Sequence, residues 1–122
     1  MVVAYWIVAG LLAFVSLYAA GLKLFRSKEQ LQGANGMAWT EGFSQGAIRL
    51  IGVAELLGAI GLIVPPLTGI APILAPIAAV GLGVLQIGAT VTHARLGERP
   101  IINLVLVALA AAAAVLGFIV WA

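Results

Sequence analysis

The segment "AIRLIGVAELLGAIGLIVPP", residues 47–66, decides the fold of this chain, because it is long and apolar and carries only two charged side chains. These are Arg49 near its start and Glu55 in its middle. A helix of about 20 residues, rising about 1.5 Å per residue, crosses a hydrocarbon layer about 30 Å thick. The segment therefore predicts a membrane-spanning helix with a carboxyl group near the bilayer midplane.

The composition of the whole chain also indicates a lipid environment. Of its 122 residues, 64% are hydrophobic and 8% are charged, whereas soluble domains are about half apolar and about a quarter charged. A chain of this length could not bury so much apolar surface in water. The net charge of +2 gives no support to nucleic acid as a partner. The absence of cysteine excludes disulfides, thiolate metal sites and CxxC redox chemistry.

Charged and turn-forming residues divide the chain into four apolar stretches. The expected helices cover residues 2–24, 43–64, 72–92 and 100–121. We expect Pro65 and Pro66 to stop the second helix, and the first span to be retained as a helix because no basic segment precedes it. No stretch alternates with the period of two that a barrel strand requires. The sequence thus predicts an all-α fold, a four-helix transmembrane bundle that forms a single domain over residues 1–122.

The distribution of basic residues predicts the orientation of the bundle. All six lie in, or next to, the two connections on one side: Lys23, Arg26, Lys28, Arg49, Arg95 and Arg99. The positive-inside rule places these connections in the cytoplasm and both termini on the non-cytoplasmic side. We expect Tyr5, Trp6 and Trp121 to meet at the outer boundary as an aromatic belt.

Glu55 is the most informative polar residue. A charged side chain at mid-depth costs several kcal/mol unless it is paired or reaches water, so we expect it to face the bundle interior. Arg49 and Lys23 could each bend toward Glu55 or extend to the membrane interface. The sequence leaves open whether Glu55 is ionised, and whether it binds a ligand or is a hydrogen-bonded strut between helices.

The other polar side chains gather in the same half of the bundle. Gln86 and His93 are seven residues apart and share one face of the third helix, and Asn103 lies near the start of the fourth. Three interpretations stay open: a polar pocket for a ligand headgroup, a proton path to Glu55, or ordinary hydrogen bonding between helices. One histidine without companions makes no metal site, and no catalytic constellation is present.

Two further patterns concern packing and surface. The small-xxx-small pairs Ala54/Gly58, Ala79/Gly83 and Gly88/Thr92 predict close helix contacts. In the polar connection, residues 27–42, Ser27 and Gln30 have capping-box spacing and Asn35-Gly36 is a turn signal. Trp39 is expected at the headgroup level. This connection is either an interfacial connector or a docking surface for a partner.

The chain resembles the DoxX and DoxX-like membrane proteins. The resemblance rests on "IRLIGVAELLGAIGLIVP" and "LAPIAAVGLGVLQIGATVTHARLGE", and it extends over almost the whole chain, including "GLKLF" at the end of the first span. Its most specific part is the second-helix pattern of Arg49, Gly52, Glu55, Gly58, Gly61 and Pro65. The resemblance implies a multi-pass protein of the bacterial inner membrane.

Named members of this family are linked to membrane oxidoreductase assemblies, including subunits of thiosulfate:quinone oxidoreductase, while many others have no assigned activity. The resemblance makes Arg49 and Glu55 the polar pair of the second helix and His93 the polar end of the third. Because this chain has no cysteine and no cofactor-ligating cluster, we do not expect it to be an enzyme on its own.

Three functions compete at this point. The first is a membrane subunit that binds a quinone or lipid-like ligand, in contact with the bilayer and with protein partners or further copies of itself. Its ligand would meet Lys23, Arg49, Glu55, Gln86, His93 and Asn103. The second is a small proton-coupled transporter that uses Glu55; in the small multidrug type, however, the glutamate lies in the first helix. The third is a scaffold or assembly factor that acts through residues 27–42.

Overall fold

The computed structural model describes residues 1–32, 40 and 42–122, and this part of the chain contains helices and no strand. The helices are α1 (Val2–Phe25), α2 (Lys28–Gln32), α3 (Gln45–Thr68), α4 (Leu74–Arg95) and α5 (Ile101–Trp121). All but α2 are long and apolar enough to cross a membrane. The predicted all-α fold with four transmembrane helices is confirmed.

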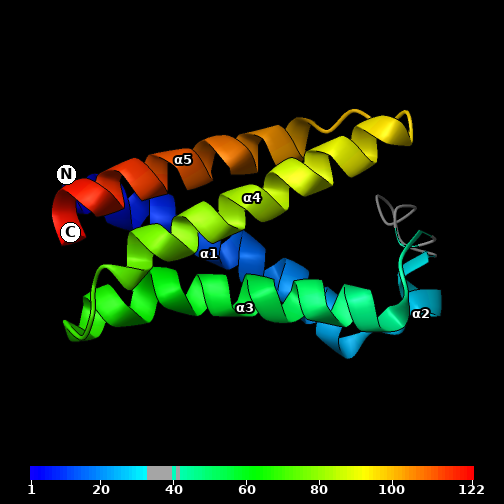
Figure 1. Cartoon of the computed structure of the whole chain (residues 1–122), viewed down its shortest axis with the longest axis horizontal. Coiled ribbons are helices and arrows are strands. Elements are labelled where there is room, and N and C mark those ends of the chain that lie inside the picture. Colours follow the sequence, from blue (N-terminus) through cyan, green and yellow to red (C-terminus); the bar gives the residue numbers. More distant parts are fainter. Residues whose placement is uncertain (33–39, 41) are drawn as a thin grey trace.

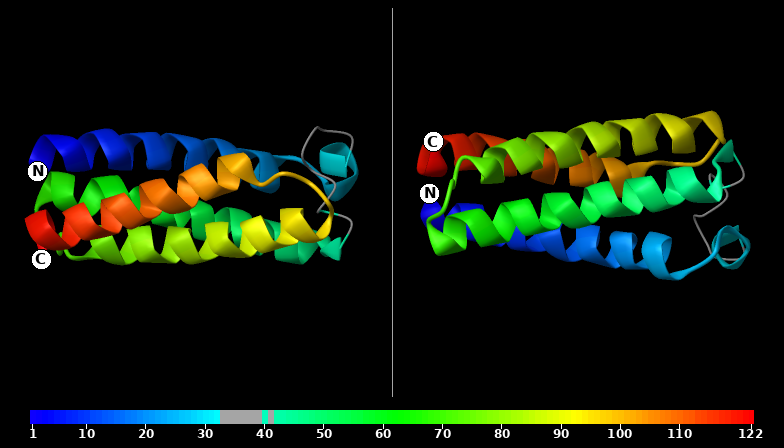
Figure 2. Two further views of the ribbon diagram at one scale, coloured as in Figure 1. Left: turned by 90° about the horizontal axis from the view of Figure 1, so that it is seen from above. Right: turned by 60° about the horizontal axis from the view of Figure 1, so that its bottom comes forward.

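The four long helices pack in a ring. The neighbours are α1 and α3, α3 and α4, α4 and α5, and α5 and α1. Both termini lie at one end of the bundle, called the terminal end, whereas α2 and residues 96–100 lie at the other, called the loop end (Figures 1 and 2). The α1–α3 pair and the α4–α5 pair approach each other at the terminal end and diverge toward the loop end (Figure 1).

The core is built from small and aliphatic side chains of all four long helices. It includes Tyr5, Ala9, Leu12, Ala59, Leu62, Ala75, Ala79, Leu82, Ala110 and Ala113. Large apolar residues such as Phe14, Leu57 and Leu104 are exposed on the outside of the bundle. This arrangement is typical of helices in lipid, where small residues at the interfaces bring the backbones close together.

Glycines of α3 make the contact with α4 possible. A Cβ atom added to Gly61 would lie 2.8 Å from the Cβ of Ala78, and one added to Gly58 would lie 2.5 Å from a methyl carbon of Leu82. Gly83 faces Ala110 of α5 at a less crowded 3.4 Å. These contacts are packing within one chain. Gly88 has no such neighbour, so the Gly88/Thr92 pair makes no helix contact of this kind.

The prediction that Pro65 and Pro66 stop the second helix is wrong, because α3 continues through both of them to Thr68. Pro66 has no N–H to donate to the carbonyl of Leu62, one turn earlier. That carbonyl instead accepts a hydrogen bond of 2.7 Å from the buried hydroxyl of Tyr5 in α1. A neighbouring helix thus satisfies the acceptor that proline leaves open, and the helix ends only at Gly69, whose φ of 75° is left-handed.

The other helix bounds differ little from the predictions. The third span begins two residues later than expected, at Leu74, because Pro72 lies in the preceding turn and its carbonyl accepts from the N–H of Ala75. It ends at Arg95 rather than Thr92. The second span begins at Gln45 rather than Phe43, because the side chain of Ser44 caps the helix.

The three aromatic residues at the terminal end meet as predicted. Tyr5, Trp6 and Trp121 stack edge to face, with ring centroids 5.4 to 5.9 Å apart. The expected belt at the membrane boundary needs correction, since Tyr5 is fully buried inside the bundle. The hydrogen bond of its hydroxyl to Leu62 explains this burial.

The polar connection begins as the sequence predicts. The N–H of Ser27 donates to Oε1 of Gln30 at 2.9 Å, and the N–H of Gln30 donates to Oγ of Ser27 at 3.2 Å. This reciprocal pair is the predicted capping box, and it starts α2. The predicted turn at Asn35-Gly36 and the placement of Trp39 lie outside the described residues.

Replacing Tyr5 by phenylalanine tests the role of its hydroxyl in α3. Tyr5→Phe leaves the Leu62 carbonyl without a partner in an apolar interior, so we expect the free energy of unfolding to fall by about 1–3 kcal/mol. Unfolding in mixed detergent micelles, followed by circular dichroism, measures this loss. The matched control is Tyr18→Phe, which alters an exposed tyrosine of the same helix and should cost little; equal losses would contradict the assignment.

Replacing Gly61 by alanine tests the α3–α4 contact. The added methyl group meets the Cβ of Ala78, which can yield only if a backbone moves. We expect Gly61→Ala to lower the free energy of unfolding by about 1–3 kcal/mol. Gly81→Ala is the control, because a Cβ there has open space around it. A stability of Gly61→Ala that matches this control would refute the close contact.

Candidate functional site

A pocket of about 940 Å³ lies at the loop end, where the two helix pairs diverge. All four long helices contribute to its lining. Five of the six predicted site residues are among the lining residues: Lys23, Glu55, Gln86, His93 and Asn103. Its walls are mainly apolar, with Ile51, Leu85 and Leu106 among them. The residues that sequence patterns single out on separate helices therefore surround one space.

Glu55 lies in the bundle interior and forms an ion pair with Lys23. The Nζ–Oε1 distance is 2.8 Å, and the two side chains are 9% and 4% exposed. Lys23 comes from the last turn of α1, whereas Glu55 is in the middle of α3. Their helices approach closely at Gly52, which has no side chain. A Cβ atom added there would lie only 3.0 Å from the Cβ of Lys23. The lysine stem thus crosses α3 beside Gly52, and its ammonium group reaches Glu55.

Arg49 is absent from the pocket lining. Its guanidinium donates a hydrogen bond to the carbonyl of Leu24, in the last turn of α1. A cation is favourable there because the last carbonyls of a helix lack intrahelical donors. Arg49 precedes Glu55 by about 9 Å along α3 and lies about 120° around it. Of the two cations that could bend toward Glu55, Lys23 is therefore the one that pairs with it.

Gln86 and Asn103 join α4 to α5 inside the pocket. The Nδ2 of Asn103 donates a hydrogen bond of 3.0 Å to Oε1 of Gln86, which is buried. The hydroxyl of Thr90 donates to the backbone carbonyl of Gln86 at 2.8 Å. These amides are polar groups that a ligand in the pocket would meet.

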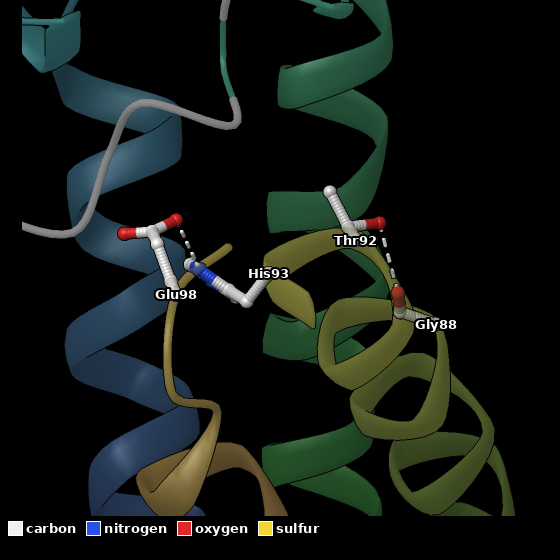
Figure 3. A network of polar contacts seen from close by, with 4 residues as sticks. All are labelled: Gly88, Thr92, His93 and Glu98. Atoms are coloured by element: carbon white, nitrogen blue, oxygen red, sulfur yellow. Dashed lines mark hydrogen bonds and ion pairs between the residues drawn. The ribbon is translucent and has the colours of Figure 1, made fainter. Parts of the chain in front are cut away.

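His93 lines the pocket and contacts Glu98. The Nδ1–Oε1 distance is 3.0 Å, and the two side chains point toward each other in Figure 3. The neighbouring Thr92 instead donates to the carbonyl of Gly88 in its own helix (Figure 3). Glu98 comes from the connection between α4 and α5, so this pair ties the connection back to the helix.

Sequence reasoning missed Glu98 as a pocket residue, although a signal was present. Gly97 follows Leu96, the C-cap residue of α4, and has a left-handed φ of 76°, as is common at helix C-termini. The N–H of Glu98 then bonds back to the carbonyl of His93 at 3.1 Å. The motif "HARLGE" thus returns Glu98 to the histidine five residues before it. The exposed Arg99 also lines the pocket.

The arrangement suits an elongated molecule with one polar end. Apolar side chains can contact a hydrocarbon chain or ring system, and the few polar groups can orient a head. The charges of the interior are paired with each other: Lys23 with Glu55, and His93, when protonated, with Glu98. These residues are better suited to binding a ligand than to catalysing a reaction.

A double-mutant cycle tests the buried ion pair. We expect Lys23→Met or Glu55→Gln alone to lower the free energy of unfolding by about 3–5 kcal/mol, because each leaves one buried charge without its partner. The double variant removes both charges and should recover most of the loss. Unfolding in mixed micelles measures the cycle, and Arg26→Met serves as the control at an exposed cation near the same helix end. Additive losses in the double variant would refute the pairing.

A comparison with known protein families identifies the family to which this chain belongs. The family model of the DoxX-like family matches residues 7–117, a range that includes every pocket residue named above. A comparison with curated proteins and one with solved structures found no match. The family match covers nearly the whole chain and confirms the resemblance seen in its second and third spans. This protein is a multi-pass membrane protein that belongs to the DoxX-like family.

Proposed function

We propose that this protein is a non-catalytic membrane subunit that binds a quinone or another lipid-like ligand in the pocket at the loop end. The observation that carries the proposal is the pocket itself, with its volume of about 940 Å³ and its mainly apolar walls. Small-molecule sites are typically of this kind, with volumes of about 300–1,000 Å³ and a few polar groups that fix the ligand's orientation.

Exposed residues in the pocket lining support a ligand that comes from the bilayer. Tyr18 of α1 and Ile102 of α5 both line the pocket, and they are 67% and 73% exposed. Both residues thus belong to the pocket lining and to the outer surface of the bundle. In a membrane-spanning bundle, that surface faces lipid or the lipid headgroups, so an apolar molecule can enter without crossing water.

The terminal end of the bundle favours binding over transport. The aromatic contacts of Tyr5 and its hydrogen bond to Leu62 fill the interior there. A transporter needs a path that continues through this region, and its coupling acid, Glu55, is already paired with Lys23. The proton-coupled transporter is thus the less supported alternative. The scaffold alternative depends on residues 27–42, much of which lies outside the described part of the chain.

The DoxX-like family also bears on where the protein would act and with which partners. Because the DoxX resemblance links members to oxidoreductase assemblies, we propose that the bound ligand serves such an assembly in the bacterial inner membrane, with the loop end in the cytoplasm. The redox step would belong to a partner protein, since this chain has no cysteine. Such a partner would meet the same pocket that binds the ligand.

Filling the pocket tests the proposal. Ala89 lines the pocket, so Ala89→Phe should occupy the ligand's space and weaken binding of a long-chain quinone at least about tenfold. Native mass spectrometry of the protein in mild detergent measures quinone binding and also reports any molecule that co-purifies. The matched control is Ala111→Phe, which adds the same ring on the exposed face of α5. Equal binding by both variants, or no retained amphiphile in the unaltered protein, would refute the proposal.

A further inference from the structure

The charged side chains of the pocket interior already have partners. Lys23 pairs with Glu55 at 2.8 Å, and His93 contacts Glu98 at 3.0 Å. An anionic head placed among them would meet two carboxylates, and a cationic head would meet the Lys23 ammonium. Burying a further charge is costly unless a counterion is at hand. Arg99 also lines the pocket, but it is exposed, so solvent weakens its attraction for an anion.

The amides of Gln86 and Asn103 are different, because their mutual hydrogen bond leaves part of each unused. The bond from Nδ2 of Asn103 to Oε1 of Gln86 uses one donor and one acceptor. Within the described part of the chain, the Nε2 of Gln86 and the Oδ1 of Asn103 form no further hydrogen bond. Gln86 is only 7% exposed and lines the pocket, so a molecule in the pocket can contact its unused NH₂ group.

The same kinds of group stay free if both side-chain amides are flipped, so that the oxygen and nitrogen of each exchange places. The hydrogen bond would then run from Gln86 to Asn103, and the Oε1 of Gln86 and the Nδ2 of Asn103 would be left. In either arrangement the pair offers one acceptor oxygen and one donor NH₂ group, on two residues that line the pocket. Hydrogen bonds from a ligand to these free groups would add to its affinity.

We infer that the ligand of this pocket is a neutral amphiphile, and that the Gln86–Asn103 pair binds the carbonyl and hydroxyl groups of its head. This inference rests on the proposed function and specifies the chemistry of its ligand. The NH₂ group donates to a carbonyl or ether oxygen of the head, and the amide oxygen accepts from a hydroxyl. Leu85 and Leu106, which also line the pocket, contact the attached hydrocarbon.

Two probes that differ by one phosphate group test the inference. Monooleoylglycerol has a neutral head with ester and hydroxyl groups, and monooleoylglycerol phosphate adds an anionic phosphate to it. We expect the delipidated full-length protein to bind the neutral probe at least about tenfold more tightly, measured by titration in native mass spectrometry. Gln86→Met and Asn103→Leu, which keep side-chain size and remove one amide each, should each weaken that binding about tenfold.

The control variant is Thr90→Val. Thr90 lies one turn after Gln86, outside the pocket lining, and its hydroxyl bonds only to its own helix. We expect the control to bind the neutral probe as the unaltered protein does. Helicity and elution as a single species identify folded variants. If one of the two amide variants fails to fold, the other still tests the inference.

The outcomes distinguish this inference from the proposed function. Tighter binding of the phosphate probe, or unchanged affinity in both folded amide variants, would overturn the neutral-head inference while leaving a lipid-binding pocket in place. Failure of both probes and of the quinone to bind the unaltered protein would overturn the proposed function itself. Preference for the neutral probe, lost in the amide variants and kept in Thr90→Val, supports both.

Discussion

Polar groups inside a bilayer must find partners within the protein, because hydrocarbon offers no hydrogen bonds. This constraint accounts for the polar contacts that cross between helices in this bundle. The hydroxyl of Tyr5 satisfies the Leu62 carbonyl that Pro66 leaves without a donor. Lys23 neutralises Glu55, and Asn103 donates to Gln86. Each contact joins two different helices, so satisfying a polar group also fixes how the helices pack.

These contacts divide the bundle into two functional halves. At the terminal end, alanines and glycines let the four backbones approach, and the aromatic cluster around Tyr5 closes the interior. At the loop end the helix pairs diverge (Figure 1), and residues of all four long helices line the pocket there. Lys23 with Glu55, and Gln86 with Asn103, already form contacts across the helices there, and polar groups that are positioned before a ligand arrives lower the cost of binding it.

The pairing of Lys23 with Glu55 bears on what Glu55 can do in this protein. A lone carboxyl group at mid-depth suggests a titrating acid, as in a proton-coupled transporter. A carboxylate held by a lysine from the neighbouring helix is instead a fixed dipole in a pocket wall, next to the amides that remain available to a ligand. The ion pair thus favours ligand binding over proton movement. It also makes Gln86 and Asn103, rather than Glu55, the groups expected to contact the ligand.

The fold class, the number of spans and the half of the bundle in which polar groups gather could all be predicted from the sequence. Each depends on length, hydropathy or helical spacing, which are local properties of the chain. The sequence also indicated the capping box at Ser27 and the close helix contacts at Gly58. Only the tertiary structure decided that Lys23, and not Arg49, pairs with Glu55, since that choice depends on how α1 crosses α3 at Gly52. It likewise decided that α3 continues past Pro66, because the rescuing donor, Tyr5, comes from a helix 57 residues away along the chain.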